Sequence, residues 1–150
     1  FVSLLLEAFL LVLRNEQNML LDGFPRTLWQ MYLFLDKMKK LKRDFRVINL
    51  DLDEWVAVNR LSSRRVCRSC SATFSLLLDP WLDRCKLCNS KLFQRQDDNP
   101  EVIQSRIATF KKETLPIIQK YKELWVFYNV DASLTLGQQQ ERIQEIIDLR

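Results

Sequence analysis

Two CxxC pairs constrain this chain more than any other feature of its sequence. They are "CRSC" (67–70) and "CKLC" (85–88), and fourteen residues separate them. Each pair can place two thiolates on one tight turn, and two such turns complete a tetrahedral sulfur site for zinc. No ligand position stays open for water, which predicts a structural zinc rather than a catalytic one. Two disulfides are the alternative, and they require an oxidising compartment.

The cysteines lie in a turn-rich segment that differs in texture from the sequence on either side. We therefore predict three parts, namely core residues 1–65, a zinc-binding lobe over 66–94 and core residues 95–150. Phe74 and Leu92 are expected to form the apolar centre of the lobe. So short a segment buries little apolar surface, so most of its stability should come from the metal.

Strands alternate with helices over the rest of the chain. Apolar spacing and capping residues predict helices over 3–17, 27–42, 53–65 and 135–149, and a long helix that Asn99 and Pro100 begin and Pro116 kinks. Short apolar runs predict strands at 19–22, 45–52 and 125–130. This alternation indicates an α/β fold with a parallel sheet covered by helices.

Composition excludes some functional classes. The 150 residues contain no His, which removes the commonest general base, and only two Gly. No GxxxxGK[ST] or GxGxxG motif occurs among them. The apolar run from Phe1 to Leu13 is shorter than the roughly 20 residues of a membrane span and lacks the features of a signal peptide. The net charge of +4 mildly favours anionic partners such as nucleotides or RNA.

Three motifs together carry a resemblance to a known family. "LLDGFPRT" (20–27), "VNRLSSRRVCRSC" (58–70) and "QRQDDNPEVIQSR" (94–106) occur in the order found in adenylate kinases. The chain resembles the bacterial type, whose lid carries zinc, over nearly its whole length. The resemblance implies a P-loop-kinase-like parallel sheet flanked by helices, with the cysteine segment inserted as the lid.

The resemblance also implies an activity and its residues. The family transfers a phosphoryl group from ATP to AMP, with magnesium on the nucleotide, by positioning and charge neutralisation. Arg26 is similar to the arginine that grips the AMP phosphate, and Gln30 to the residue that reads adenine. Asp97 and Asp98 resemble the acidic pair at the lid hinge, where Asp97 orients an arginine. The remaining implied positions are Val2 in the AMP pocket wall, Asp22 in the magnesium-water network, Arg60 against the ATP adenine, Arg64 on the ATP phosphates, and Arg95 and Arg106 closing over both substrates. The alternative for these arginines is a solubilising surface.

Several family features do not occur in these residues. The family's first strand, P-loop and AMP-binding helix do not precede Phe1. Its usual glycines are replaced by Ser63, Ser71, Asn89 or Ser90, and Ala132. Because the family's first strand lies in the middle of the sheet, we expect a preceding segment, a rearranged sheet or a partner's strand to fill that place.

Three interpretations of function follow. The first is a nucleotide-binding protein without activity of its own, kept as a structural or binding subunit of a larger assembly. The second is a genuine adenylate kinase whose P-loop segment lies outside this sequence. The third is a basic zinc module that binds RNA, which the lysines at 37–42 favour but no base-stacking aromatic pattern supports. Reduced thiols favour the cytoplasm or an organelle matrix.

Overall fold

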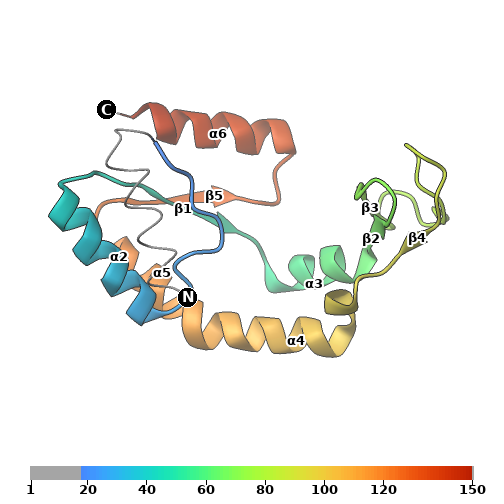
Figure 1. The fold of residues 1–150 in the computed structure, drawn as a ribbon, viewed down its shortest axis with the longest axis horizontal. Coiled ribbons are helices and arrows are strands. Elements are labelled where there is room, and N and C mark those ends of the chain that lie inside the picture. Colours follow the sequence, from blue (N-terminus) through green and yellow to red (C-terminus); the bar gives the residue numbers. More distant parts are fainter. Residues whose placement is uncertain (1–17, 150) are drawn as a thin grey trace. The chain divides into compact units, whose positions relative to one another are not determined.

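The computed structural model describes residues 18–149 (Figure 1). The chain divides into two compact units. Unit 1 comprises Phe1–Leu50, Phe110–Val130 and Thr135–Arg150, and unit 2 comprises Asp51–Thr109 and Asp131–Leu134. The expected helix over 3–17 lies outside the described residues. No helix in the described part of the chain is both long and apolar enough to cross a membrane.

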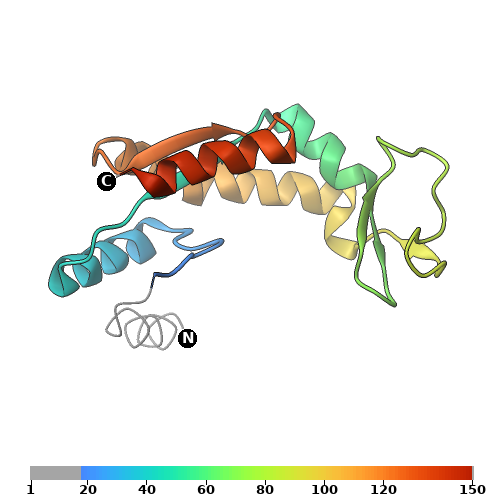
Figure 2. The same cartoon turned by 90° about the horizontal axis from the view of Figure 1, so that it is seen from above.

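A two-stranded parallel sheet forms the centre of unit 1. It pairs β1 (Val47–Asp51) with β5 (Phe127–Asp131) and begins where the Val47 N–H donates to the Val126 carbonyl at 2.7 Å. Helix α6 (Leu136–Asp148) lies on one side of the strands, with α2 (Leu28–Leu41) and α5 (Leu115–Lys122) on the other (Figure 1). Seen from above, α6 runs along β5 (Figure 2). The parallel α/β architecture predicted from the sequence is confirmed.

Local sequence explains where α2 begins and ends. The Thr27 hydroxyl accepts the N–H of Gln30 and caps the helix. Met31, Phe34 and Met38 recur at helical spacing and are buried. The helix ends at Lys42, whose left-handed backbone (φ 52°) turns its N–H back to the Lys39 carbonyl.

The core of unit 1 lies between these helices and the strands. Met31, Ile117 and Tyr121 are its buried members. Phe45 packs edge-on against Tyr121, with ring centroids 6.3 Å apart. The other contributing side chains are Leu35, Val47, Val126 and Phe127.

The strand predicted at 19–22 is wrong. Residues 18–21 have no regular structure, and Leu20 is 88% exposed. A strand forms when a neighbour pairs its backbone N–H and C=O groups. In the described part of the chain the sheet of unit 1 contains β1 and β5, and it does not extend to this segment.

Unit 2 contains the cysteine lobe and the helices that lead into and out of it. Helix α3 (Glu54–Ser63) is capped by Asp53 and runs directly into β2 (Arg64–Cys67). β2 pairs antiparallel with β3 (Thr73–Ser75) on one side and β4 (Leu92–Phe93) on the other. A 3₁₀ turn (Gln96–Asp98) then leads to α4 (Pro100–Thr109), and the Asn99 side chain accepts the Val102 N–H at 2.9 Å. The predicted Asn99 cap is confirmed.

The helix predicted to kink at Pro116 becomes irregular before that residue. α4 ends at Thr109, and a π-helical segment (Phe110–Thr114) precedes α5. Proline lacks an N–H, and its ring crowds the carbonyl four residues before it, here that of Lys112. The wider π turn accommodates this loss, so the irregular segment ends two residues before the proline.

Candidate functional site

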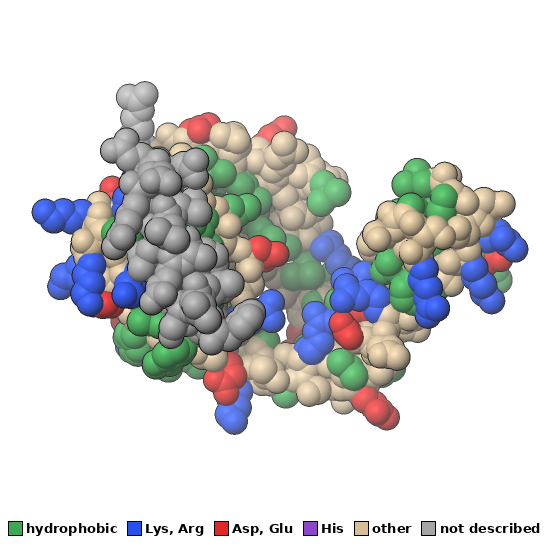
Figure 3. Space-filling model, in the orientation of Figure 1, with side chains coloured by type: hydrophobic (Ala, Val, Ile, Leu, Met, Phe, Trp, Pro, Cys, Tyr) green, Lys and Arg blue, Asp and Glu red, His purple; other side chains and the backbone are tan. Residues whose placement is uncertain are grey.

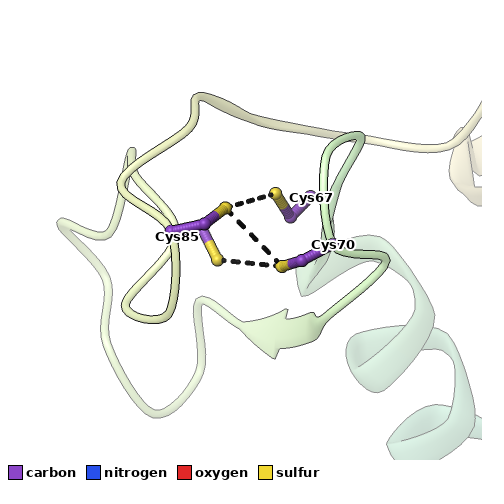
Figure 4. A group of neighbouring side chains, drawn as sticks. Cys67, Cys70 and Cys85 are labelled. Atoms are coloured by element: carbon purple, nitrogen blue, oxygen red, sulfur yellow. Dashed lines mark hydrogen bonds between the residues drawn. The ribbon is translucent and has the colours of Figure 1, made fainter.

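The four cysteines converge into one sulfur cluster. All four Sγ atoms lie within 4.8 Å of one another. The contacts are 3.4 Å for Cys67 to Cys88, 3.5 Å for Cys70 to Cys85 and 3.6 Å for Cys88 to Cys70. Figure 4 shows Cys67 and Cys70 together on one side of the cluster, facing Cys85, which comes from the other loop. A tetrahedron of zinc–sulfur bonds of about 2.3 Å has edges of about 3.8 Å, so the cluster could hold a structural zinc. Disulfides, which need about 2.05 Å, do not fit.

The two CxxC turns share one backbone pattern. The Ser71 N–H donates to the Cys67 carbonyl at 2.9 Å, and the Asn89 N–H donates to the Cys85 carbonyl at 2.8 Å. Ser71 (φ 59°) and Asn89 (φ 58°) both adopt the left-handed conformation that favours glycine. Of the two positions left open for the second turn, Asn89 is therefore the one that takes the glycine-like place.

Two cysteines of the cluster have pKa values shifted in opposite directions. Hydrogen bonds from the side chain and backbone of Ser90 lower the pKa of Cys88 to about 6. The pKa of Cys70 is raised to about 12, because hydrogen bonding with Cys85 and the other thiols outweighs a hydrogen bond from the Ala72 backbone. Since zinc binds thiolates, metal binding would release the protons that the cluster retains.

A small apolar centre surrounds the buried side of the cluster. Cys67, Cys85 and Leu92 are buried, and Phe74, Ala72 and Leu82 pack against them. The predicted roles of Phe74 and Leu92 are confirmed. So small a core stabilises the lobe only weakly, which is consistent with a metal as its main support.

Arg64 and Asp98 form the strongest ion pair of the described residues. The Arg64 Nε and Nη2 donate to the two carboxylate oxygens of Asp98 at 2.8 and 2.5 Å. Asp98 is fully buried, while the Arg64 side chain is one-quarter exposed. The hydrogen bond from Arg64 lowers the pKa of Asp98, and the same bond raises the pKa of Arg64. The pair fixes the edge of the guanidinium that carries Nε and Nη2. The pairing of Arg64 with Asp98 was not predicted from the sequence.

Two further arginines gather around the same acidic turn. Arg95 donates to the Asp97 carboxylate at 3.0 Å, a contact of the kind that the predicted orienting role of Asp97 requires. The Arg106 Nη1 lies 3.4 Å from the Asp97 carbonyl and 4.0 Å from the Asp98 carboxylate. The Arg95 and Arg106 side chains are about half exposed, at 47% and 50%. The 3₁₀ turn thus brings three of the predicted arginines together, two of them with guanidinium surface in solvent.

Gln94 braces this turn and was not predicted. Its side-chain amide donates to the Asp98 carbonyl at 2.7 Å and to the Ser62 carbonyl at 3.3 Å. The bond to Ser62 ties the turn to the end of α3. The signal in the sequence is only that Gln94 begins "QRQDD", because both of its bonds go to backbone that no motif marks.

Arg60 lies in α3 and contacts the loop that follows β5. Its Nη1 donates to the Ala132 carbonyl at 2.8 Å. Both residues belong to unit 2. The resemblance implies that Arg60 lies against the ATP adenine, and the structure places Arg60 in contact with Ala132, where the family usually has a glycine.

Arg26 and Gln30 belong to unit 1 and form a local turn before and within α2. The Gln30 side-chain oxygen accepts the Arg26 N–H at 2.6 Å, and the Arg26 Nε donates to the Gly23 carbonyl at 2.7 Å. Gly23 has φ +70°, and a Cβ there would lie 2.6 Å from Arg26 Nη2. Gly23 is therefore required for this placement of the guanidinium, which is exposed.

Two predicted positions are less defined. Asp22 is exposed at the bend before Gly23. Val2 lies outside the described residues. The roles of both remain predictions, as do the nucleotide contacts of the arginines.

Known proteins match the sequence along most of the chain. Residues 1–126 match the family model of adenylate kinase. The adenylate kinases of Staphylococcus aureus (strain Mu50) and Staphylococcus epidermidis (strain ATCC 12228) are each 35% identical to this chain over 136 residues. Those residues cover 89% of this chain and 63% of each relative, so the chain spans less than two thirds of their length. The chain therefore belongs to the adenylate kinase family.

Proposed function

We propose that these residues supply the nucleotide-holding arginines of an adenylate-kinase-type phosphotransferase. The gathering of Arg64, Arg95 and Arg106 around one acidic turn supports this most directly. Arginine suits the task because its planar fork binds phosphate oxygens with two hydrogen bonds and stays charged. A solubilising surface would not require a buried carboxylate to orient one of the three.

The three arginines differ in how firmly they are held. Asp98 fixes Arg64 with two hydrogen bonds and the Arg64 side chain stays one-quarter exposed, so Arg64 is suited to act as a preorganised anion ligand. Arg95 makes one ion pair, with Asp97, whereas Arg106 makes a 3.4 Å hydrogen bond to the Asp97 carbonyl and lies 4.0 Å from the Asp98 carboxylate; both side chains are about half exposed. Arg95 can leave the acidic turn for a phosphate at little cost in free energy, because exposed ion pairs contribute only about 0–1 kcal/mol.

The proposed acceptor side uses Arg26 and Gln30. The Arg26 guanidinium has one donor occupied by the Gly23 carbonyl, and within residues 18–149 no hydrogen bond of its terminal nitrogens competes with the phosphate of a nucleoside monophosphate. The Gln30 side chain shares the same turn through the Arg26 N–H, so base and phosphate recognition would be coupled. Asp22, just before Gly23, would orient water on a magnesium ion bound with the nucleotide.

In the proposed reaction a phosphate oxygen of AMP attacks the γ-phosphorus of ATP. The bond between that phosphorus and the β–γ bridging oxygen breaks, and two ADP molecules result. The arginines neutralise charge that spreads over the transferred group. Magnesium, when bound with ATP, would supply further positive charge to the phosphates.

Turnover also needs a glycine-rich loop with its lysine beneath the phosphates. These 150 residues contain no GxxxxGK[ST] sequence. Removing one preorganised oxyanion donor typically lowers the rate about 100- to 1,000-fold. We therefore propose that this polypeptide by itself binds nucleotide without appreciable turnover, as a binding or structural component. The second candidate is a complete adenylate kinase that combines these residues with such a loop, and the oriented Arg64–Asp98 pair favours it, because an idle site need not keep it.

A coupled assay of ADP formation from ATP, AMP and magnesium separates these candidates. For this polypeptide we expect ATP binding by calorimetry but no measurable ADP. Turnover above about 1 per second, ordinary for kinases, would contradict the inactive proposal and support a complete enzyme. Absence of any ATP binding, with Lys91→Gln as the matched surface control, would contradict both.

A further inference from the structure

Trp125 is exposed in a backbone conformation that its side chain disfavours. The residue lies between α5 and β5, has φ 54° and is 96% exposed. A bulky residue with positive φ is a true outlier, since glycine is the usual choice there. The exposed indole gains little from packing, so the stability of the fold does not explain a tryptophan at this position. Such outliers are found preferentially at functional sites.

A concentration of basic side chains lies at the same end of unit 1. Residues 36–43 carry five basic residues and one acid, a charge equal to the whole chain's net +4. Figure 3 shows Lys and Arg side chains gathered at the end that α2 reaches in Figure 1. We define the basic end of unit 1 as Lys39, Lys40, Lys42, Arg43, Arg46, Lys120 and Lys122.

Contacts along the chain join the segment that follows α2 to the segment that contains Trp125. Phe45 packs against Tyr121 with ring centroids 6.3 Å apart, which places the start of β1 beside the end of α5. The Val47 N–H then donates to the carbonyl of Val126, the residue after Trp125. Basic residues in the last turns of α2 and α5 also complement the helix dipoles. That explanation does not cover the indole, and Arg46 donates to the Leu149 carbonyl.

We propose that Trp125 and the basic end of unit 1 bind single-stranded nucleic acid. One base stacks on the indole face, while the lysines and arginines contact successive phosphates, the combination that sequence-tolerant single-strand binding uses. An anionic lipid surface would share the charge, but insertion depends on an apolar face. Near this end the described residues expose Leu124 at 41% and Leu149 at 49%, beside seven basic side chains, so charge rather than apolar area dominates the surface. The observations therefore favour a polynucleotide.

This surface is separate from the proposed nucleotide site. Arg26 and Gln30 lie at the first turn of α2, and the lysines lie at its last turn. Fourteen helical residues span about 20 Å. The two proposals can therefore fail independently.

Fluorescence anisotropy with a labelled oligouridine of about twelve nucleotides tests the proposal, within the site sizes of single-strand binders. The zinc-loaded 150-residue protein is titrated with ATP and AMP in excess, so that the nucleotide site is filled. We expect a dissociation constant below about 100 µM at physiological salt that weakens as salt rises. Labelled DNA of matching length serves as a second probe, and phosphatidylcholine vesicles containing phosphatidylserine as a third.

Trp125→Gly is the decisive variant because glycine suits positive φ. We expect an affinity loss of roughly 5- to 150-fold, the effect of losing one stacked base, with a melting temperature unchanged or raised. Trp125→Phe should recover part of the affinity. Trp81→Gly removes a 91% exposed tryptophan from the cysteine lobe and should leave affinity unchanged.

The double variant Lys39→Gln with Lys42→Gln tests the charges. If it removes two phosphate contacts, the slope of the logarithm of the binding constant against the logarithm of the salt concentration should become about 1.4 less steep. Lys91→Gln is the control. Equal affinity of wild type and Trp125→Gly would overturn the proposal. So would the absence of salt-dependent binding, or binding to the vesicles in place of both oligonucleotides. Arg26→Ala should leave oligonucleotide binding intact while it weakens AMP binding.

Discussion

The cysteine lobe and the sheet of unit 1 are held together by different kinds of contact. In the lobe, ligands three residues apart form two matching turns, and only Cys67, Cys85 and Leu92 are buried. In unit 1, β1 pairs with β5 through Val47 and Val126, which lie far apart in the sequence, and Met31, Ile117 and Tyr121 fill the core. A metal site can therefore replace a core in a short segment, whereas the sheet depends on packing across the whole chain.

Removing the metal should produce the largest difference between the two regions. Structural zinc contributes on the order of 10 kcal/mol to small Cys-rich modules, so chelation or Cys85→Ser should unfold the lobe while unit 1 remains folded. Calorimetry should show a new low-temperature transition, and elemental analysis should give one zinc per chain. Leu87→Ala, in the same CxxC turn as Cys85 but exposed and not a ligand, is the control. A single transition that chelation does not change would contradict a zinc-supported lobe.

Breaking the Arg64–Asp98 pair should have the next largest effect. Asp98→Asn leaves Arg64 without its carboxylate, and we expect a loss of about 2–4 kcal/mol in unfolding free energy, near the lower limit for buried pairs because Arg64 is partly exposed. Asp97→Asn, at an exposed pair, should lose about 0–1 kcal/mol. Equal losses in urea titrations of the two variants would mean that burial of Asp98 is not what strengthens its pair.

The same pair predicts a dependence on pH. Its hydrogen bonds lower the folded-state pKa of Asp98 below the usual 3.8. The stabilisation is therefore complete above that pH and is lost as the pH falls through the folded-state value. Wild type should consequently lose more stability than Asp98→Asn in acid below that point, as measured by urea midpoints. Parallel curves for the two proteins would contradict this.

Backbone strain in the CxxC turns should have a smaller effect. Ser71→Gly should stabilise the lobe by about 1 kcal/mol, because glycine adopts φ 59° without the steric penalty of a Cβ. Asn89→Gly should gain less, since asparagine tolerates this region. Ser69→Gly, at a position without positive φ, should gain nothing. Thermal midpoints of the zinc-loaded variants provide the measurement, and a destabilised Ser71→Gly would show that its side chain is needed.

Tyr121→Phe should have the smallest effect. Among the described residues, its hydroxyl is buried without a hydrogen-bond partner, and burial raises the pKa of the phenol. Removing an unpaired polar group should leave the unfolding free energy within about 1 kcal/mol of wild type or raise it. A loss above about 2 kcal/mol would instead indicate a hydrogen bond made by that hydroxyl in the protein in solution.

Features set by neighbouring residues could be predicted from the sequence. The four cysteine ligands, the Asn99 cap, helix α2 and the strands at β1 and β5 each depend on a pattern within a short window. The strand at 19–22 could not be decided in this way, because apolar residues specify a strand only when a neighbour pairs with it. Pro116 predicted a break but not its position, which depends on where the ring meets the preceding turn.

The site divides in the same way. The arginines and acids were identified from "DGFPRT" and "QRQDD", because they lie within specific motifs. The pairing of Arg64 with Asp98 joins residues 34 positions apart, and the contact of Arg60 with Ala132 joins residues 72 apart. Spacing within one motif carries no information about such pairs. Trp125 was likewise read as part of a strand, because the sequence gives no sign of its positive φ.

Calorimetric titration of AMP into wild type, Arg26→Ala and Lys40→Ala tests the central claim, that these arginines are nucleotide ligands, most directly. Arg26→Ala should weaken AMP binding about 10- to 100-fold, the loss of charged hydrogen bonds to phosphate, while Lys40→Ala, which breaks only an exposed pair with Asp36, should change it less than about threefold. Equal effects of the two substitutions would contradict the assignment of Arg26 to the nucleotide.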